Sequence, residues 1–222
     1  MGYEIRVVRM RRGEVWDFDG WAETYDSAVE ASSRIYARYG EVLDAVVEVA
    51  RVGPGKRVLD IGTGTGNLAK RCLVRGASVV GLDPSEKMLA QARAKMGGHS
   101  NADLVQADEP FLRIPFPDAY FDAVVSTYAF HHVPHHLKPA SVREMVRVIV
   151  PGGLWAIGDL AFADEPAERR ALQKYPWLEE EYFARVEDLR PVFMRLGMEL
   201  GSKQFTPVTW VLWAKKPAET VL

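Results

Sequence analysis

A run of glycines beside an acidic residue is the strongest chemical signal in the sequence. The run DIGTGTGN at residues 60–67 has glycines at Gly62, Gly64 and Gly66, between an apolar stretch and an amphipathic one. Glycines at a strand-to-helix turn allow a tight bend and the close approach of a ligand to the backbone. The spacing is G-x-G-x-G, whereas dinucleotide loops carry G-x-G-x-x-G and bind a pyrophosphate at the helix N-terminus. Because Asp60 stands two positions before the first glycine, the loop favours a ligand that carries positive charge. A generic strand-turn-helix loop is the alternative interpretation.

Two further carboxylates follow later strands in the same order along the chain. Asp83 ends an apolar run at residues 78–83, and Asp108 follows a shorter run at residues 103–107. The carboxyl ends of the strands in an open α/β sheet form the edge where ligands bind. There Asp83 can accept hydrogen bonds from both ribose hydroxyls of an adenosine group, and Asp108 from an adenine amino group. Singly, Asp83 is also explained as a favourable charge at the start of the next helix, and Asp108 as a surface turn. The glycine loop, Asp83 and Asp108 in this order indicate an adenosine-containing ligand more specifically than either carboxylate does alone.

S-adenosyl-L-methionine has the features that this set would select. It contains an adenosine group and no phosphate, and both its amino group and its sulfonium are cationic. The sulfonium makes it a reactive methyl donor, so that the cofactor carries much of the chemistry and leaves as S-adenosyl-L-homocysteine. The protein then has to align the acceptor, the methyl group and the sulfur in line, exclude water and, where needed, remove a proton from the acceptor.

Four of the five histidines follow the fourth apolar run: His131, His132, His135 and His136. We expect His131 or His132 to line the acceptor pocket as a general base, because an imidazole titrates near neutral pH. Stacking on the cofactor or capping of the next helix is an equally good explanation. A metal site is not expected, since Pro134 interrupts any helix through these residues and no cysteine or nearby acidic cluster completes a ligand set. His135 and His136 are expected in solvent.

Short apolar runs alternate with amphipathic stretches, which is the pattern of a parallel sheet covered by helices. The strands expected between residues 58 and 160 are 58–61, 78–83, 103–107, 121–126 and 154–160. Two more runs, 198–205 and 208–214, are joined by only two residues, so that they must pair antiparallel. Crossover strands followed by a terminal hairpin do not match a six-stranded parallel dinucleotide domain.

The expected helices have recognisable ends. Apolar residues at helical spacing between positions 35 and 50 predict one long helix. Ser85 is placed to cap the helix that follows the second strand. Ser141 and Glu144 have capping-box spacing ahead of another helix. Gly197 is a natural stop for the last helix.

Aromatic residues are dense near the N-terminus: Trp16, Phe18, Trp21 and Tyr25. Packing in the core is the default role for aromatics at such spacing. An aromatic face beside a sulfonium also makes a cation–π contact. For Trp21 and Tyr25 the two roles are equally favoured, whereas Phe18 is assigned to the core.

Four segments carry a closer resemblance: FDGWAETYDS at residues 18–27, the glycine loop, VSTYAFHH at residues 125–132 and DLAFAD at residues 159–164. With EYF at 181–183 and WVLW at 210–213, they extend over nearly the whole chain. The sequence resembles the class I S-adenosylmethionine-dependent methyltransferases (methyltransferase type 11-like). Within these it is similar to a small bacterial family of unassigned substrate.

The resemblance implies a Rossmann-like α/β fold, with a mostly parallel seven-stranded sheet, an antiparallel C-terminal strand and helices on both faces. It implies S-adenosyl-L-methionine as the cofactor, with Gly62, Asp83 and Asp108 as principal contacts and residues 18–27 folding over it as a lid, Tyr25 near its methionine end. The full set of expected cofactor contacts is Asp60, Gly62, Gly64, Gly66, Asp83, Asp108, Trp21 and Tyr25. At position 83 relatives often have glutamate, which is one methylene longer.

We expect one domain over residues 1–222. Its parts are an N-terminal lid and helix region (1–50), a cofactor-binding core (51–161), a substrate-side insert (162–186), and a C-terminal helix and hairpin (187–222). The insert contains Arg169, Arg170, Tyr182 and Arg185, which suit either an acidic acceptor or a solvated helix face.

Composition limits the acceptor. The formal net charge is −2 with a pI near 6.2, and there is no basic stripe, so that a nucleic-acid substrate is disfavoured and a small molecule is preferred. The single cysteine, Cys72, and the lack of an apolar run of ~18–20 residues or a secretory signal fit a cytoplasmic protein. Two other functions stay open: a non-catalytic protein that binds the same cofactor, and, less favoured by the loop spacing, a nicotinamide-dependent oxidoreductase.

Overall fold

The structure is a computed structural model that describes residues 18–31, 35–178 and 181–218. Trp16 lies outside the described residues. The strands are β1 (Arg57–Ile61), β2 (Ser78–Asp83), β3 (Ala102–Gln106), β4 (Phe121–Thr127), β5 (Ile149–Phe162), β6 (Ala184–Arg185), β7 (Gly201–Gln204) and β8 (Thr209–Lys215). The α-helices are α1 (Phe18–Trp21), α2 (Tyr25–Ala31), α3 (Tyr39–Val49), α4 (Asn67–Val74), α5 (Glu86–Met96), α6 (Lys138–Arg147), α7 (Glu165–Lys174) and α8 (Val186–Arg195). Three short 3₁₀ turns complete the set: η1 (Phe130–His132), η2 (His135–Leu137) and η3 (Pro176–Leu178).

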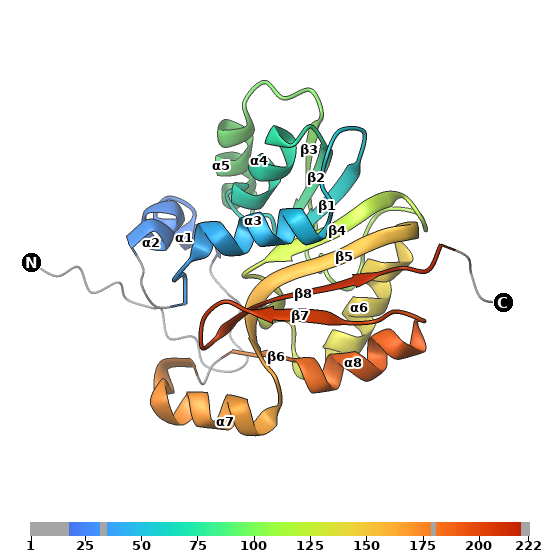
Figure 1. The fold of residues 1–222 in the computed structure, drawn as a ribbon. Helices are drawn as coiled ribbons and strands as arrows, with labels where there is room; N and C mark the ends of the chain where they lie inside the picture. The colour runs from blue at the N-terminus through green and yellow to red at the C-terminus, as the bar shows by residue number, and fades with distance from the viewer. Residues whose placement is uncertain (1–17, 32–34, 179–180, 219–222) are drawn as a thin grey trace, which may run out of the picture.

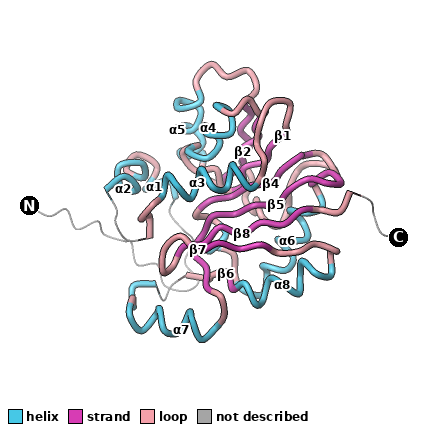
Figure 2. The backbone as a smooth tube through the Cα atoms, in the orientation of Figure 1, coloured by secondary structure: helices cyan, strands magenta, loops and turns pink. Residues whose placement is uncertain are grey.

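The strands form one twisted sheet in the order β3-β2-β1-β4-β5-β8-β7, with the two-residue β6 paired to β5 off this path. The pairs from β3 to β5 are parallel, and β8 runs antiparallel to both β5 and β7. Figure 2 shows this sheet between layers of helix. The Rossmann-like α/β class and the antiparallel C-terminal strand are confirmed.

Helices cover both faces of the sheet because alternate residues of each buried strand point to opposite sides. Val58 packs with residues of α3 and α4, whereas Leu59 and Ile61 pack with α6 and α8. Asp60 has the same parity as Val58, so that it lies on the α3 and α4 side of the sheet. The strand thus delivers one carboxylate beside the loop that follows it.

Several predicted element ends are confirmed. Ser85 caps α5, since its Oγ accepts from the N–H of Met88 at 3.1 Å. Gly197 follows α8 with φ at 68°, the left-handed conformation that ends a helix. The hairpin of β7 and β8 is antiparallel; β7 is shorter than the predicted run at residues 198–205, whereas β8 is shifted by one residue from the run at 208–214.

The predicted capping box is wrong. Helix α6 begins at Lys138, three residues before Ser141, so that Ser141 lies inside it and donates to the carbonyl of Leu137. The Glu144 carboxylate accepts from the N–H of Ile114 instead of closing a cap. The spacing was right for a cap, but Pro139 already starts the helix in its first turn.

The carboxyl ends of the central strands meet helices from both ends of the chain. In Figure 1, α1 and α2 lie at the left of the sheet together with the start of α3, and α7 lies below them on the same side. The sheet edge at the left of Figure 1 is therefore where the predicted site residues can meet.

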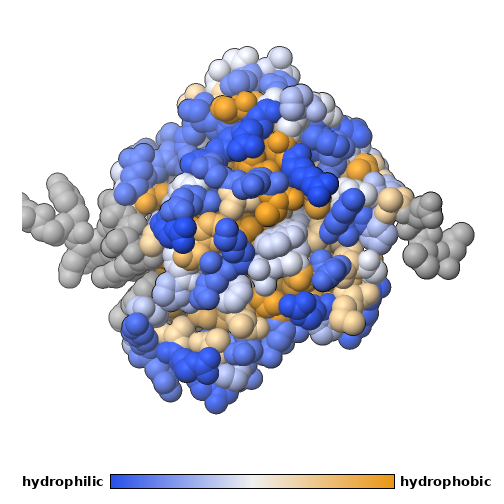
Figure 3. Space-filling model, in the orientation of Figure 1, coloured by the Kyte–Doolittle hydropathy of each residue, from blue (hydrophilic) through white to orange (hydrophobic). Residues whose placement is uncertain are grey.

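None of the described helices has the length and apolar character needed to span a bilayer. The face in Figure 3 mixes hydrophilic side chains with smaller apolar groups.

Candidate cofactor and acceptor site

The glycine loop joins β1 to α4 and needs its glycines. Gly62, Gly64 and Gly66 have φ angles of 68°, 52° and 82°, which residues with a side chain rarely adopt. No atom lies within 4 Å of the point where a Cβ on Gly64 would be, so that its backbone faces open space. A ligand can therefore approach the loop closely at Gly64.

Asp83 holds the loop from the end of β2. Its Oδ2 accepts from the N–H of Gly64 at 2.8 Å, and its Oδ1 accepts from the N–H of Ser85 at 2.9 Å. Burial raises the pKa of this carboxyl to about 6, against the lowering effect of those hydrogen bonds. Each oxygen retains acceptor capacity, because a carboxylate has about four lone-pair sites.

Asp60 carries a buried oxygen without a partner. Its side chain is fully enclosed, and Oδ2 accepts from the hydroxyl of Thr63 at 2.7 Å, whereas Oδ1 has no hydrogen bond. Burial raises the pKa of this carboxyl to about 7. An unsatisfied buried acceptor is costly, and a ligand that brings a cationic amino group would satisfy it.

The N-terminal helices are fastened to this loop. Asp26 of α2 accepts from the Thr65 hydroxyl at 2.7 Å, the Asn67 amide at 2.9 Å and the Lys95 ammonium at 2.7 Å. On α1, Asp19 accepts from the hydroxyl of Ser85, the residue that also binds Asp83 through its N–H. Helix α2 thus lies against the glycine loop, and α1 lies against the start of α5.

Tyr25 belongs to an aromatic cluster beside the loop, which we call the tyrosine cluster: Tyr25, Tyr36, Tyr39 and Tyr128. Neighbouring rings in it lie 5.2–6.1 Å apart between centroids. The hydroxyl of Tyr39 accepts from Asn67 at 3.2 Å, which ties the cluster to the glycine loop. The hydroxyl of Tyr128 is buried without a hydrogen bond. Both predicted roles of Tyr25 are thus compatible with its position.

Trp21 and Asp108 are less tightly built into this region. Trp21 is partly buried in α1, which packs on α5. Asp108 is exposed just after β3, and the preceding N–H, of Ala107, donates to the carbonyl of Asp83. The structure therefore brings Asp60, the glycines and Asp83 into one hydrogen-bonded unit, with Asp108 at its open side.

Asp159, inside β5, organises the turn after β4. Its Oδ1 lies 2.5 Å from Nδ1 of His131 and accepts from the N–H of Leu160. Its Oδ2 accepts from three successive backbone N–H groups, those of Ala129, Phe130 and His131. Burial opposes ionisation, but His131 and these donors bring the pKa of Asp159 below its usual value. Asp159 is therefore ionised and fixes the imidazole of His131.

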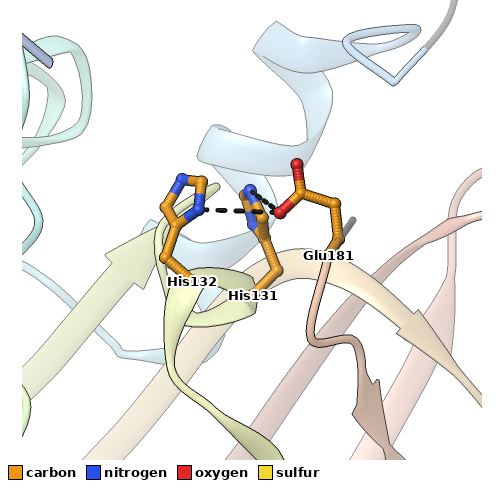
Figure 4. Close-up of side chains that lie close together, drawn as sticks. All are labelled: His131, His132 and Glu181. Atoms are coloured by element: carbon orange, nitrogen blue, oxygen red, sulfur yellow. Dashed lines mark ion pairs between the residues drawn. The ribbon is translucent and has the colours of Figure 1, made fainter. Parts of the chain in front are cut away.

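The other nitrogen of His131 faces a second carboxylate. Nε2 of His131 lies 3.8 Å from Oε2 of Glu181, and Nδ1 of His132 lies 3.6 Å from the same oxygen (Figure 4). Burial would lower the pKa of His131, but Asp159 and Glu181 outweigh it and raise the pKa. Burial and the neighbouring His131 lower the pKa of His132 well below its usual value, so that this ring is neutral.

Sequence reasoning assigned no role to Asp159, Glu181 or Lys138. Lys138 is buried, its ammonium donates to the carbonyl of Phe130 at 2.7 Å, and burial lowers its pKa to about 7. A charged residue inside the apolar run of β5 was the available signal for Asp159. The approach of Glu181 has no such signal, because it depends on a return of the chain in which the N–H of Tyr182 donates to the carbonyl of His131.

The insert arginines are largely neutralised within the protein. Arg185 pairs with Glu168 at 2.6 Å, and Arg169 pairs with Glu165 at 2.6 Å. His135 and His136 are exposed, as predicted. The charged groups of the insert are therefore engaged with one another, and the region beside the turn after β4 is lined by His131 and His132.

Comparison with known proteins identifies the family. The family described as "Methyltransferase domain" matches residues 58–153, which span β1 to the first part of β5. An uncharacterized methyltransferase of Geobacillus kaustophilus is 34% identical over 212 residues, which cover 90% of this chain and 95% of the relative. This chain belongs to the methyltransferase family. Its cofactor is S-adenosyl-L-methionine, and the enzyme is an S-adenosylmethionine-dependent methyltransferase.

Solved structures share the fold of this methyltransferase. Magnesium protoporphyrin IX methyltransferase from Synechocystis PCC 6803, solved with bound S-adenosylhomocysteine, superposes with a TM-score of 0.71 at 20% identity, covering 90% of this chain and 96% of that one. The [4+2]-cyclase SpnF superposes with a TM-score of 0.72 at 18% identity, covering 91% and 94%. Because these neighbours differ in what they catalyse, the fold alone does not name the acceptor.

Proposed function

We propose that this methyltransferase transfers its methyl group in line to a small-molecule acceptor, with the cofactor on the glycine loop and the acceptor against His131 and His132. The observation that carries this proposal is the pairing of two sites at one sheet edge. One is the orphaned carboxylate oxygen of Asp60 beside an open glycine loop, and the other is the His131–Asp159 pair after β4. The first fits a cationic ligand, and the second fits a proton acceptor.

The chain offers a partner for each part of the cofactor. Oδ1 of Asp60 would take the cationic amino group, the glycine backbone at residues 62–66 would lie against the methionine portion, and Asp83 would accept from the ribose hydroxyls. Asp108 would accept from the adenine amino group at the open side. Trp21 and the ring of Tyr25 would close the site from the lid. When bound, the cofactor supplies an electrophilic methyl group that an acceptor lone pair displaces from sulfur.

The chain's own contribution to the chemistry is on the acceptor side. Nδ1–H of His131 donates to Asp159, so that Nε2 carries the free lone pair and can take a proton from the acceptor. Asp159 then stabilises the imidazolium, which it faces at 2.5 Å in a buried setting. His132, neutral and next to it, lines the same pocket. Burial of the His131 ring, beside the partly buried His132, would keep water from the transfer.

A small acceptor suits the walls of this region. Glu181 of the insert lies against both histidines, and two of the insert's arginines, Arg169 and Arg185, are in internal ion pairs. A nucleic-acid acceptor would need a basic surface, and the net charge of −2 argues against one. The free and buried thiol of Cys72 suits the reducing cytoplasm.

Calorimetric titration tests the cofactor side of the proposal. S-adenosylmethionine and S-adenosylhomocysteine are expected to bind the wild type at micromolar concentration, and NADH is expected not to bind. Asp83→Asn should weaken both adenosyl ligands at least tenfold, because it removes the charge that the ribose hydroxyls and the N–H of Gly64 share. Asp103→Asn on β3, an exposed acid outside the site, is the matched control and should bind as the wild type does. Binding of NADH, or equal loss in both variants, would contradict the assignment.

A second measurement separates an enzyme from a non-catalytic binder of the cofactor. Release of S-adenosylhomocysteine is followed with a panel of small amines, alcohols, phenols and thiols, and with RNA and DNA as a separate arm. Turnover with a small molecule supports the proposal. Turnover with nucleic acid alone, or none with any acceptor while the cofactor binds, counts against it.

A further inference from the structure

Three potential metal ligands converge where η1 meets the segment before β6. His131, His132 and Glu181 each present one ligand atom, and these atoms lie within 4.8 Å of one another. Figure 4 shows both imidazoles turned toward the carboxylate. The sequence argument against a metal rested on the interruption at Pro134 and on the lack of a cysteine or a nearby acidic cluster; Glu181 supplies an acidic group in three dimensions, and the adjacent His131 and His132 need no helix to share the site.

The spacing of these atoms is that of ligands and not of hydrogen-bonded groups. The separations of 3.8 Å and 3.6 Å between the ring nitrogens and Oε2 are too long for hydrogen bonds. Two ligands of one tetrahedral zinc ion, at bond lengths of about 2.0–2.2 Å, are separated by about 3.3–3.6 Å. The two nitrogen–oxygen separations are therefore within a few tenths of an ångström of that spacing, and the two ring nitrogens lie within 4.8 Å of each other.

The surroundings of His131 are those of a metal-binding histidine. Its Nδ1 faces the buried Asp159 carboxylate at 2.5 Å, which leaves Nε2 as the nitrogen that points to Glu181. Such carboxylate–histidine pairs orient metal ligands and raise their basicity.

We propose that His131, His132 and Glu181 form a binding site for one divalent transition-metal ion of the Zn²⁺ type, which blocks methyl transfer when occupied. Two imidazoles and one carboxylate are a ligand set that Zn²⁺, Co²⁺ and Fe²⁺ accept, and the fourth position is left to water. The inhibitory part rests on the proposed function, because the ion would occupy Nε2 of His131, the atom that takes the acceptor's proton. The cofactor contacts at Asp60 and Asp83 are not among the ligands.

The test is titration of the metal-free full chain with Zn²⁺ by calorimetry and with Co²⁺ by visible absorption, each with and without S-adenosylmethionine. One ion per chain is expected, with the intense visible bands of tetrahedral Co²⁺. Glu181→Gln and His132→Asn should each weaken binding at least tenfold. His136→Asn removes an exposed histidine close in sequence and should bind as the wild type does.

The outcomes separate this site from the cofactor assignment. Retained S-adenosylmethionine binding in the two ligand variants, together with lost metal binding, supports the proposal. The proposal is overturned if the wild type binds no stoichiometric metal ion, even when the cofactor binds normally. It is also overturned if His132→Asn and Glu181→Gln bind the metal as tightly as the wild type does. In the acceptor assay, one equivalent of Zn²⁺ should suppress turnover of the wild type, and undiminished turnover with the ion bound overturns the inhibitory role.

Discussion

A Cβ atom built on Gly62 would lie 2.4 Å from the Cβ of Ala129. The loop after β1 therefore touches the turn after β4 with no room for a side chain. The first loop is the expected cofactor cradle, and the second leads directly into His131 and His132. This contact therefore holds the proposed cofactor half of the site against its proposed acceptor half.

Substitution of Gly62 should destabilise the whole protein. Gly62→Ala combines a left-handed φ of 68°, which costs about 1–2 kcal/mol, with a clash that costs about 1–3 kcal/mol. Urea denaturation should show a fall of about 2–5 kcal/mol in the free energy of unfolding. Gly53→Ala is the control, because Gly53 has no positive φ and no atom within 4 Å of its built Cβ, and it should be neutral. A loss of only about 1–2 kcal/mol would remove the clash with Ala129, and equal stability of the two variants would remove the backbone cost as well.

Gly64 should separate binding from stability. A Cβ there would meet nothing within 4 Å, so that Gly64→Ala has only the backbone cost of its φ of 52°, about 1–2 kcal/mol. The methyl group would project into the space where the ligand approaches the loop. S-adenosylmethionine affinity should fall at least tenfold in calorimetry, while the protein stays folded by circular dichroism. An unchanged dissociation constant would remove Gly64 from the cofactor site.

The elements of the core were predictable because their signals are local. The apolar runs that became β1, β2 and β4 are short and bounded by glycine or polar residues, and the glycine spacing selected the loop type. The terminal antiparallel pairing followed from a short connection, whereas the order of the strands in the sheet appears only in the structure. Strand burial and turn formation depend on the residues of a short stretch, so that both can be predicted from a single sequence.

The acceptor side was only half predictable because its contacts are distant in sequence. His131 and His132 stood out by residue type, but their partners Asp159 and Glu181 come from β5 and from the chain before β6. Asp159 also anchors three consecutive N–H groups, a role that appears only once the turn after β4 is folded over β5. The error at Ser141 has the reverse cause: a local pattern was overridden by a helix that begins three residues earlier.

The stability of the cofactor-free protein should depend on pH through Asp60. Burial raises the pKa of its carboxyl to about 7, above the value near 3.9 expected when the chain is unfolded. Because the folded-state pKa is raised, the folded protein favours the protonated form, and this stability is present below about pH 4 and lost as the pH rises toward 7. The effect is on the order of 4 kcal/mol, since each pKa unit corresponds to about 1.4 kcal/mol.

Asp60→Asn checks this dependence, because an amide cannot ionise. The free energy of unfolding is measured between pH 4 and pH 8 for both proteins without cofactor, and the variant should lose less stability over that range. A smaller dependence should persist in the variant, because the pKa of Asp83 is also raised, to about 6. Parallel pH profiles would show that Asp60 ionises as freely when folded as when unfolded. Saturation with S-adenosylmethionine should flatten the wild-type profile, since a cationic amino group favours the ionised carboxylate.

His131 should matter for turnover and not for cofactor affinity. Its Nδ1 is committed to Asp159 and its Nε2, 3.8 Å from Glu181, is the proposed proton acceptor, so that His131→Gln removes this group while the glycine loop and Asp83 are untouched. With any acceptor found by adenosylhomocysteine release, kcat should fall about 10²–10⁴-fold, the range for loss of a general base. The dissociation constant for S-adenosylmethionine should stay within about threefold of the wild type. His136→Asn, which changes an exposed histidine five residues away, should retain full turnover. A wild-type kcat in His131→Gln would mean that the acceptor reaches the methyl group already deprotonated, and the role of the pair with Asp159 would then be to hold the turn after β4 in place.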